Sequence, residues 1–316
     1  MRKVDYSVVV PVYYNDTTLE YTEDRIRRLV FEKVPWKGEI VFVDDGSGDR
    51  SFEVLCKLQK RHPEDIRVFK LSRNFGQDNA LWCGMEHCSN AIIQLSADGQ
   101  DPIDLIPEML DRHFNGGKEI VIAKRASRDE TPYRRWTSAI VYWFIKKLGH
   151  EDMPVGGFDF LLLGDRARRE HVRIWQPNTF TQVRILELGY PREWIPYHRE
   201  DRKGGVSKWT FAKKFTLMID AVLGHSYLPI RAMSVIGFAF SALSFLLAAY
   251  FFASYFIEGS EIRGWTPIVL LILFIGGLQM SMTGVLGEYL WRVLAQSRND
   301  VPYIVEKTID ETESHA

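Results

Sequence analysis

The sequence lacks a charge excess of either sign. Its 316 residues carry 40 Lys and Arg against 41 Asp and Glu, a formal net charge of −1 at pH 7. Nucleic-acid-binding proteins usually show a basic excess or a basic stripe, so we expect any anionic partner to be held by local clusters. The chain is 46% hydrophobic, which is ample for a full core. Its length predicts roughly two folding units.

Cysteines and the common metal and phosphate motifs are also scarce. Cys56, Cys83 and Cys88 form no C-x-x-C pair and leave an odd one, which favours reduced thiols in a cytosolic compartment over a disulfide framework. The eight histidines form no H-E-x-x-H, and there is no Walker lysine motif. Gly46-Ser47-Gly48 resembles the start of a dinucleotide fingerprint, but Ser51 stands at the third glycine position. These absences argue against a nicotinamide enzyme, a P-loop enzyme and a soft-ligand metal centre.

Charge is absent from two long stretches near the C-terminus, residues 232–257 and 265–287. Each meets the length of about 20 apolar residues that a membrane-spanning helix needs, so we predict an integral membrane protein with two transmembrane helices. The alternative is a long buried helical hairpin. Basic residues flank the outer ends, while the connecting loop holds only Arg263, which predicts that both termini are cytoplasmic. The flanking residues are Lys213, Lys214, Arg231, Arg292 and Arg298.

The N-terminal part of the chain alternates apolar runs with amphipathic helical stretches. The expected strands are residues 6–12, 39–43, 66–71, 91–95 and 119–123. Four strand-helix alternations are typical of an α/β fold with a mostly parallel sheet. We therefore predict a Rossmann-like sheet in this part.

Polar side chains come after three of these strands. They are Asp44-Asp45, Arg73-Asn74 and Asp98. Because ligands of open α/β sheets bind beyond the carboxyl ends of the strands, these residues are expected to line one crevice. The carboxylates at 44 and 45 suit hydrogen bonds from a ribose or a base, and Asp98 suits a metal ion on a diphosphate. A nucleotide is the ligand that uses both.

Asp98 is the first candidate for a metal ligand, with Gln100 beside it. Mg²⁺ and Mn²⁺ prefer oxygen ligands and often bridge one or two carboxylates to substrate phosphates. Asp101, by contrast, is expected to cap the helix that begins near Pro102.

Four stretches, taken together in their order and spacing, resemble glycosyltransferase family 2, which has the GT-A fold. They are Val10-Pro11-Val12-Tyr13-Tyr14-Asn15, Val43-Asp44-Asp45-Gly46-Ser47, Arg73-Asn74-Phe75-Gly76 and Ala97-Asp98-Gly99-Gln100-Asp101-Pro102. The basic stretch 202–209, the amphipathic stretch after it and the two charge-free stretches are together similar to the polyprenyl-phosphate branch of that family. This branch includes dolichyl-phosphate mannose synthases and bactoprenol glucosyltransferases.

The resemblance implies a role for each matching residue. Asp98 and Asp159 are the implied catalytic residues, and Asp98 with Gln100 would hold Mg²⁺ or Mn²⁺. The implied donor-binding residues are Pro11, Tyr13, Asp44, Asp45, Arg73 and Ser96. The implied ligands of the acceptor phosphate are Arg202, Ser207 and Lys208.

Two positions depart from the family pattern. The usual Asp-Ala-Asp reads Ser96-Ala97-Asp98, so a hydroxyl replaces one carboxylate. In Gly156-Gly157-Phe158-Asp159-Phe160 the usual Asp before the Phe and Arg after it are both absent, and Asp159 is the nearest substitute for the carboxylate.

The implied reaction is inverting transfer of a sugar from a UDP- or GDP-linked donor to a polyprenyl phosphate, undecaprenyl or dolichyl, at the cytoplasmic membrane face. The predicted parts are a GT-A domain (1–208), an interfacial helix on the bilayer (209–227), a two-helix anchor (228–292) and a cytoplasmic tail (293–316). Glycines at 276, 277, 284 and 287 permit close helix packing and hence a homo-oligomer. Two alternatives stay open: transfer to a sugar hydroxyl in polysaccharide synthesis, and a non-catalytic nucleotide-sugar-binding membrane protein.

Overall fold

The computed structural model describes residues 4–125, 153–154, 157–174, 181–197, 230–233, 235–240, 242–243, 246, 250, 265–297 and 301–310. The chain divides into two compact units. The first comprises Met1–Phe215 and Val301–Ala316, and the second Thr216–Asp300. The predicted residues Arg202, Ser207 and Lys208 and the interfacial helix 209–227 lie outside the described residues.

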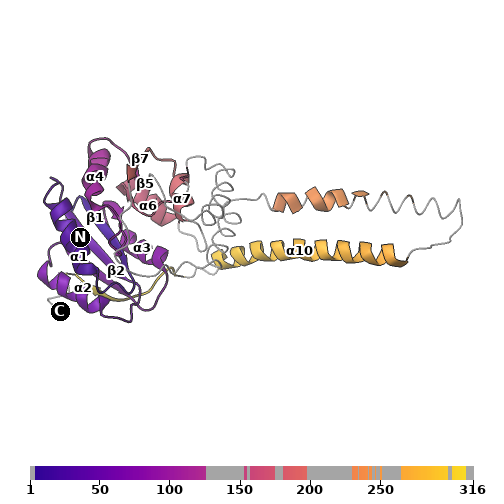
Figure 1. Ribbon diagram of the computed structural model, residues 1–316, viewed down its shortest axis with the longest axis horizontal. Coiled ribbons are helices and arrows are strands. Elements are labelled where there is room, and N and C mark those ends of the chain that lie inside the picture. Colours follow the sequence, from indigo (N-terminus) through magenta and orange to yellow (C-terminus); the bar gives the residue numbers. More distant parts are fainter. Residues whose placement is uncertain are drawn as a thin grey trace. The chain divides into compact units, whose positions relative to one another are not determined.

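The first unit is built on an eight-stranded mixed sheet of order β7-β5-β6-β4-β1-β2-β3-β8 (Figure 1). The strands are β1 (Tyr6–Val12), β2 (Gly38–Asp44), β3 (Ile66–Leu71), β4 (Ala91–Gln94), β5 (Ile120–Arg125), β6 (Leu161–Leu163), β7 (Arg192–Tyr197) and β8 (Val305–Ile309). β1 pairs parallel with β2 and β4, and β2 with β3. β6 is antiparallel to both β4 and β5, and β8 to β3. The predicted α/β fold with a mixed sheet is confirmed.

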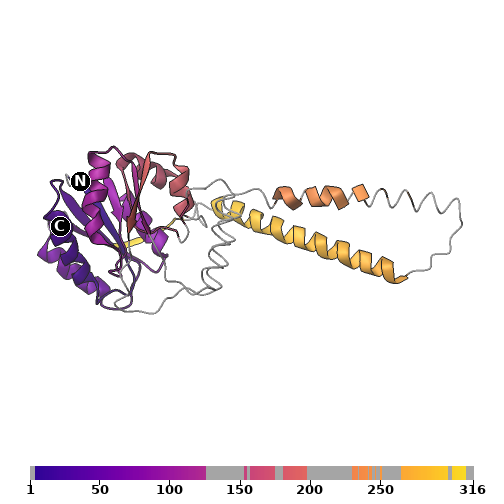
Figure 2. The ribbon, with the colours of Figure 1, turned by 45° about the horizontal axis from the view of Figure 1, so that its top comes forward.

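Helices cover both faces of this sheet (Figure 2). They are α1 (Leu19–Ile26), the π-helical turn η1 (Arg27–Phe31), α2 (Ser51–Arg61), α3 (Gln77–Glu86), the 3₁₀ turn η2 (Ile103–Leu105), α4 (Ile106–Phe114), α6 (Asp165–Arg173) and α7 (Thr181–Glu187). Successive side chains of a strand point to opposite faces. In β1 the even-numbered Val8 and Val10 belong to the main hydrophobic core, whereas Val9 faces Gly84 of α3. Strands buried on both faces explain the continuous β-branched runs in the sequence.

β8 adds a strand from the far end of the chain to the sheet edge. Its segment is held by Ser72 N–H, which donates to Ile304 O at 2.9 Å, and by the Lys70–Glu306 ion pair at 2.9 Å. The Tyr303 hydroxyl also donates to Glu86 Oε2 at 2.6 Å. The sequence analysis assigned no strand to this tail, because Val-Glu-Lys-Thr-Ile is short and charged.

The prediction of two transmembrane helices over 232–257 and 265–287, and with it that of an integral membrane location, is wrong. Among the residues that the structure describes, no helix combines the length and hydropathy needed to cross a membrane. The prediction rested on two stretches that lack charge and have the length of about 20 residues of a membrane-spanning helix. In α10 (Trp265–Ser297), Gln279, Ser281 and Thr283 interrupt the apolar sequence. The two hydroxyls donate to the carbonyls of Gly277 and Gln279, both at 2.9 Å.

The contact of α3 with the sheet gives a stability prediction. A Cβ at Gly84 would lie 2.3 Å from Val9 Cγ1 and 3.3 Å from Val43 Cγ2. Overpacking of this kind costs about 1–3 kcal/mol, so we expect Gly84→Ala to lower the free energy of unfolding by that amount. Urea denaturation followed by circular dichroism measures it. Lys57→Ala, at an exposed position of α2, is the control and should stay within about 0.5 kcal/mol of wild type. An unchanged Gly84→Ala protein would contradict the close packing.

Candidate functional site at the carboxyl edge of the sheet

The loops after β1, β2, β3 and β4 meet at one edge of the sheet. Parallel register aligns Val12 with Asp44 and Asp44 with Lys70, so three strands end together. The Thr18 hydroxyl then donates to Ala97 O at 2.7 Å and joins the loop after β1 to the loop after β4. The structure thus brings the predicted donor-binding and metal-binding stretches to one edge, and Pro11 and Tyr13 lie at the end of β1.

Asp45 organises the loop after β3. Its two carboxylate oxygens accept the backbone N–H groups of Phe75, at 2.7 Å, and Gly76, at 2.9 Å. Gly46 allows the close approach, because it has a φ of 66° and its Cβ would lie 2.5 Å from the Arg73 backbone. The Arg73 guanidinium stacks 4.2 Å from the centroid of the Phe75 ring. Asp45, predicted to contact the donor, therefore holds the loop that carries Arg73.

Asp44 is arranged differently from its neighbour. The side chain is fully buried. Its Oδ1 accepts Ser47 N–H at a long 3.4 Å, and its Oδ2 is buried with no hydrogen-bond partner among the described residues. Burial raises the pKa of the Asp44 carboxyl, against the effect of its hydrogen bonds with Ser47. Such an oxygen favours a ligand that brings an N–H or O–H donor.

The loop after β4 presents Asp98. Asp101 Oδ2 accepts Ser96 N–H at 2.8 Å, and Asp98 Oδ1 accepts Gln100 N–H at 3.0 Å. Gly99 turns the chain between them with a φ of 70°. Asp98 is half-buried, while Gln100 is only 6% exposed. The carboxylate of Asp98 is thus the more accessible of the two predicted metal ligands.

Asp101 was predicted to cap the following helix, and this prediction is wrong. η2 begins after Pro102 without a side-chain cap. The Asp101 carboxylate instead closes the 96–101 loop by its bond to Ser96 N–H. Asp side chains that accept nearby backbone N–H groups in loops are a common alternative to helix capping.

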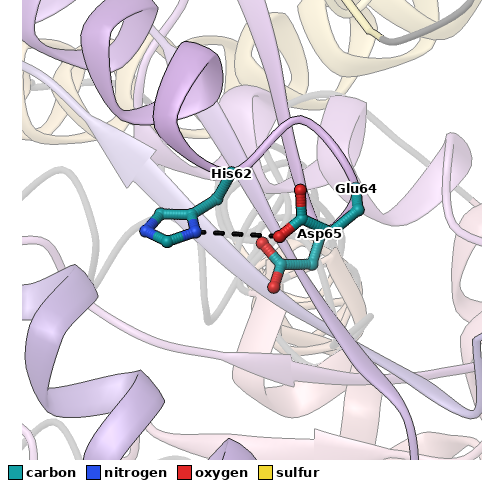
Figure 3. A group of neighbouring side chains, drawn as sticks. All are labelled: His62, Glu64 and Asp65. Carbon is teal, nitrogen blue, oxygen red and sulfur yellow. Dashed lines mark ion pairs between the residues drawn. The ribbon is translucent and has the colours of Figure 1, made fainter.

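The donor set at Asp98 fits a cation that is shared with a substrate. One accessible carboxylate is too few to hold Mg²⁺ or Mn²⁺ alone, but these ions commonly bind through one or two carboxylates together with substrate phosphates. The residues that the structure describes contain one group of three close ligand-type side chains, His62, Glu64 and Asp65 (Figure 3). It lies before β3, at the opposite edge of the sheet, and both Asp65 oxygens accept Arg27, at 2.7 and 2.9 Å.

Asp159 lies in the segment that leads into β6. It is exposed between the buried Phe158 and Phe160, and its Oδ1 accepts the Gln182 amide at 3.0 Å. Asp78, near the start of α3, is close enough that the charge of Asp159 adds to desolvation in raising the pKa of Asp78. The sequence analysis missed Asp78 and Gln182. Asp78 could have been found, because it stands two residues after the Arg73-Asn74-Phe75-Gly76 stretch.

Comparisons with known proteins show which family this chain resembles in sequence. The family model for glycosyl transferase family 2 matches residues 7–163. An uncharacterized glycosyltransferase of Bacillus subtilis, YkcC, is 31% identical over 312 residues, which cover 97% of this chain and 95% of that protein. The SfII prophage-derived bactoprenol glucosyl transferase of Shigella flexneri is 29% identical over 304 residues, 96% of this chain and 97% of that one. A solved mannosyltransferase of Pyrobaculum calidifontis, in complex with GDP-Man and Mn²⁺, is 15% identical, covers 95% of this chain and 87% of its own, and has a TM-score of 0.47.

We expect the buried charge of Asp44 to lower the free energy of unfolding at neutral pH. Because the pKa of Asp44 is raised on folding, the folded state binds its proton more readily, and stability falls as the pH rises from the ordinary Asp pKa of about 4 through the raised value. We expect Asp44→Asn to raise the melting temperature at pH 7, since it removes the buried charge, and to bring little gain at pH 4. Thermal denaturation at both pH values measures this. A less stable variant at pH 7 would show that the charge is compensated in the folded protein.

Proposed function

Because the chain belongs to glycosyl transferase family 2 and is a glycosyltransferase, we propose that it moves a sugar from a UDP- or GDP-linked donor to a polyprenyl phosphate. The single observation that carries the proposal is the carboxyl edge of the sheet, where one buried acceptor, Asp44, ends β2 and one accessible carboxylate, Asp98, lies in the loop after β4. The Shigella flexneri relative, named a bactoprenol glucosyl transferase, aligns along 96% of this chain, which supports the acceptor class.

The donor is proposed to bind across this edge. Asp44 accepts a hydrogen bond from the nucleoside, and Pro11 and Tyr13 line the nucleoside at the end of β1. Asp45 acts indirectly, because it fixes the loop of Arg73. Arg73 is exposed beside this loop and is suited to the diphosphate, since guanidinium groups bind phosphates in a bidentate manner.

Asp98 and Ser96 are proposed to lie at the diphosphate end of the donor. A divalent cation bound with Asp98 would neutralise negative charge on the departing nucleoside diphosphate. Gln100 is a weaker candidate ligand, because its side chain is almost fully buried. Its backbone N–H instead orients the Asp98 carboxylate.

The nucleophile in this proposal is a phosphate monoester, which carries about 1.5 to 2 negative charges at pH 7. Such a group attacks the anomeric carbon without losing a proton to a base, so a single displacement inverts that centre. Asp159 would then position the sugar, held by the Gln182 amide. A hydroxyl acceptor would need a base within hydrogen-bond reach. Arg202, Ser207 and Lys208 stay our predicted ligands of the acceptor phosphate.

A transfer assay tests the proposal directly. Purified protein is mixed with undecaprenyl phosphate, Mg²⁺ or Mn²⁺ and one radiolabelled nucleotide sugar at a time, and label that enters the organic phase is counted. We expect one donor to be used and EDTA to stop transfer. If none of the donors gives a labelled lipid product, the proposed acceptor class is contradicted.

Asp98→Asn should lower transfer by at least about 100-fold, because the amide neither neutralises nor ligates the cation as a carboxylate does. Asp104→Asn is the matched control: it removes an exposed carboxylate six residues on and should leave the rate within about twofold of wild type, as surface substitutions usually do. Equal rates for the two variants would remove Asp98 from the mechanism.

Ser96→Asp rebuilds the Asp-x-Asp pattern. A second carboxylate raises the ligand charge, and we expect about tenfold tighter Mn²⁺ binding in the presence of nucleoside diphosphate. Titration followed by Mn²⁺ electron paramagnetic resonance measures this without turnover. Unchanged Mn²⁺ affinity would mean that position 96 does not face the cation.

A further inference from the structure

Tyr14 adopts an unusual backbone conformation at the carboxyl edge. Its φ is 57°, and it is the one described non-glycine residue with a positive φ. Bulky side chains rarely occupy this region, and such outliers concentrate at ligand sites and switches. The ring is nevertheless 51% exposed and contacts Tyr13 edge-on, with ring centroids 4.7 Å apart. Core packing therefore does not account for the conformation.

Ser47 connects Tyr14 to the buried carboxylate of Asp44. The Ser47 hydroxyl accepts Tyr14 N–H at 3.1 Å. The Ser47 N–H in turn donates to Asp44 Oδ1, at a long 3.4 Å. A ligand donor that takes the place of Ser47 on Asp44 would thus also disturb the bond that holds Tyr14.

Gly48 provides the space for the Tyr14 side chain. A Cβ at Gly48 would lie 2.7 Å from the Tyr14 hydroxyl oxygen and 3.5 Å from Cζ, and the three atoms nearest to it all belong to Tyr14. The end of the ring thus lies beside Gly48, which follows the residue whose N–H donates to Asp44. Asp44 Oδ2 has no partner among the described residues.

We propose that Tyr14 is a latch on the nucleoside subsite, closed across Gly48 in this structure and released when a nucleoside donor group replaces the Ser47 N–H on Asp44. The inference rests on the proposed nucleotide-sugar site and adds to it a residue that controls entry. When only the open fraction of a protein binds, the apparent Kd exceeds the intrinsic Kd by the inverse of that fraction. A substitution that opens the latch should therefore tighten nucleotide binding.

Gly48→Ala tests the latch, because the new methyl group meets Tyr14 first. Binding of UDP and of GDP to the full chain is measured by calorimetry for wild type, Gly48→Ala, Tyr14→Asn and the double variant. Asn removes the ring and tolerates a positive φ. We expect Gly48→Ala and Tyr14→Asn each to lower the Kd of the nucleotide that binds by about threefold to tenfold, as release from a mostly closed state implies. The double variant should bind like Tyr14→Asn.

Three results would overturn the latch: an unchanged or weaker affinity in Gly48→Ala, an equal effect of that substitution in the Tyr14→Asn background, or weaker binding by Tyr14→Asn. If the wild-type protein binds neither nucleotide, that result contradicts the proposed function and therefore also the latch. The two failures are therefore distinguishable.

A spectroscopic measurement tests the latch even if the variants lose stability. The full chain is labelled with 3-fluorotyrosine at its 13 tyrosines, and Tyr14→Phe identifies the Tyr14 resonance by its disappearance. Saturating nucleotide should shift this ¹⁹F resonance, and Gly48→Ala should shift it in the same direction without nucleotide. A Tyr14 resonance that nucleotide does not move would refute the latch.

Discussion

The carboxyl edge depends on how two adjacent buried carboxylates are satisfied. Burying a carboxylate is costly unless hydrogen bonds compensate it. Asp45 accepts two backbone N–H groups from the loop after β3, which oppose the rise in its pKa that burial causes. Asp44 is compensated only in part, through Ser47, and one of its oxygens stays without a partner in the described structure. The first carboxylate fixes the loop, and the second retains hydrogen-bonding capacity for a ligand.

The difference between these neighbours comes from contacts distant in sequence. Successive residues at a strand end point to opposite sides, so Asp45 meets the returning 72–76 loop while Asp44 lies under the 46–48 turn. Gly46 is required for the first contact because of its positive φ and its distance from Arg73. Gly48 leaves room for the Tyr14 side chain, since a Cβ there would lie 2.7 Å from the Tyr14 hydroxyl oxygen.

The sequence predicted the parallel strands and the edge at which their polar ends meet, because hydrophobic runs and turn residues are local signals. It could not distinguish Asp44 from Asp45, nor show that Asp101 closes a loop, since both depend on backbone donors that tertiary structure supplies. The sequence analysis did not predict β8, because a short charged strand at a sheet edge has no hydrophobic signature. The membrane prediction was wrong, because no described helix combines the length and hydropathy of a membrane span.

The proposed reaction sets a charge problem that the edge helps to solve. The donor diphosphate and the acceptor phosphate are both anionic, and each carboxylate beside them adds repulsion that grows in a low-dielectric site. Here a hydroxyl stands at Ser96 and a glycine at Gly157 where the family usually has carboxylates. Asp45 accepts two backbone N–H groups, and burial together with the charge of Asp159 raises the pKa of Asp78. Asp98 is then the carboxylate best placed to share a cation with the diphosphate. An edge with few free negative charges suits an acceptor that is itself a phosphate better than one that is a sugar hydroxyl.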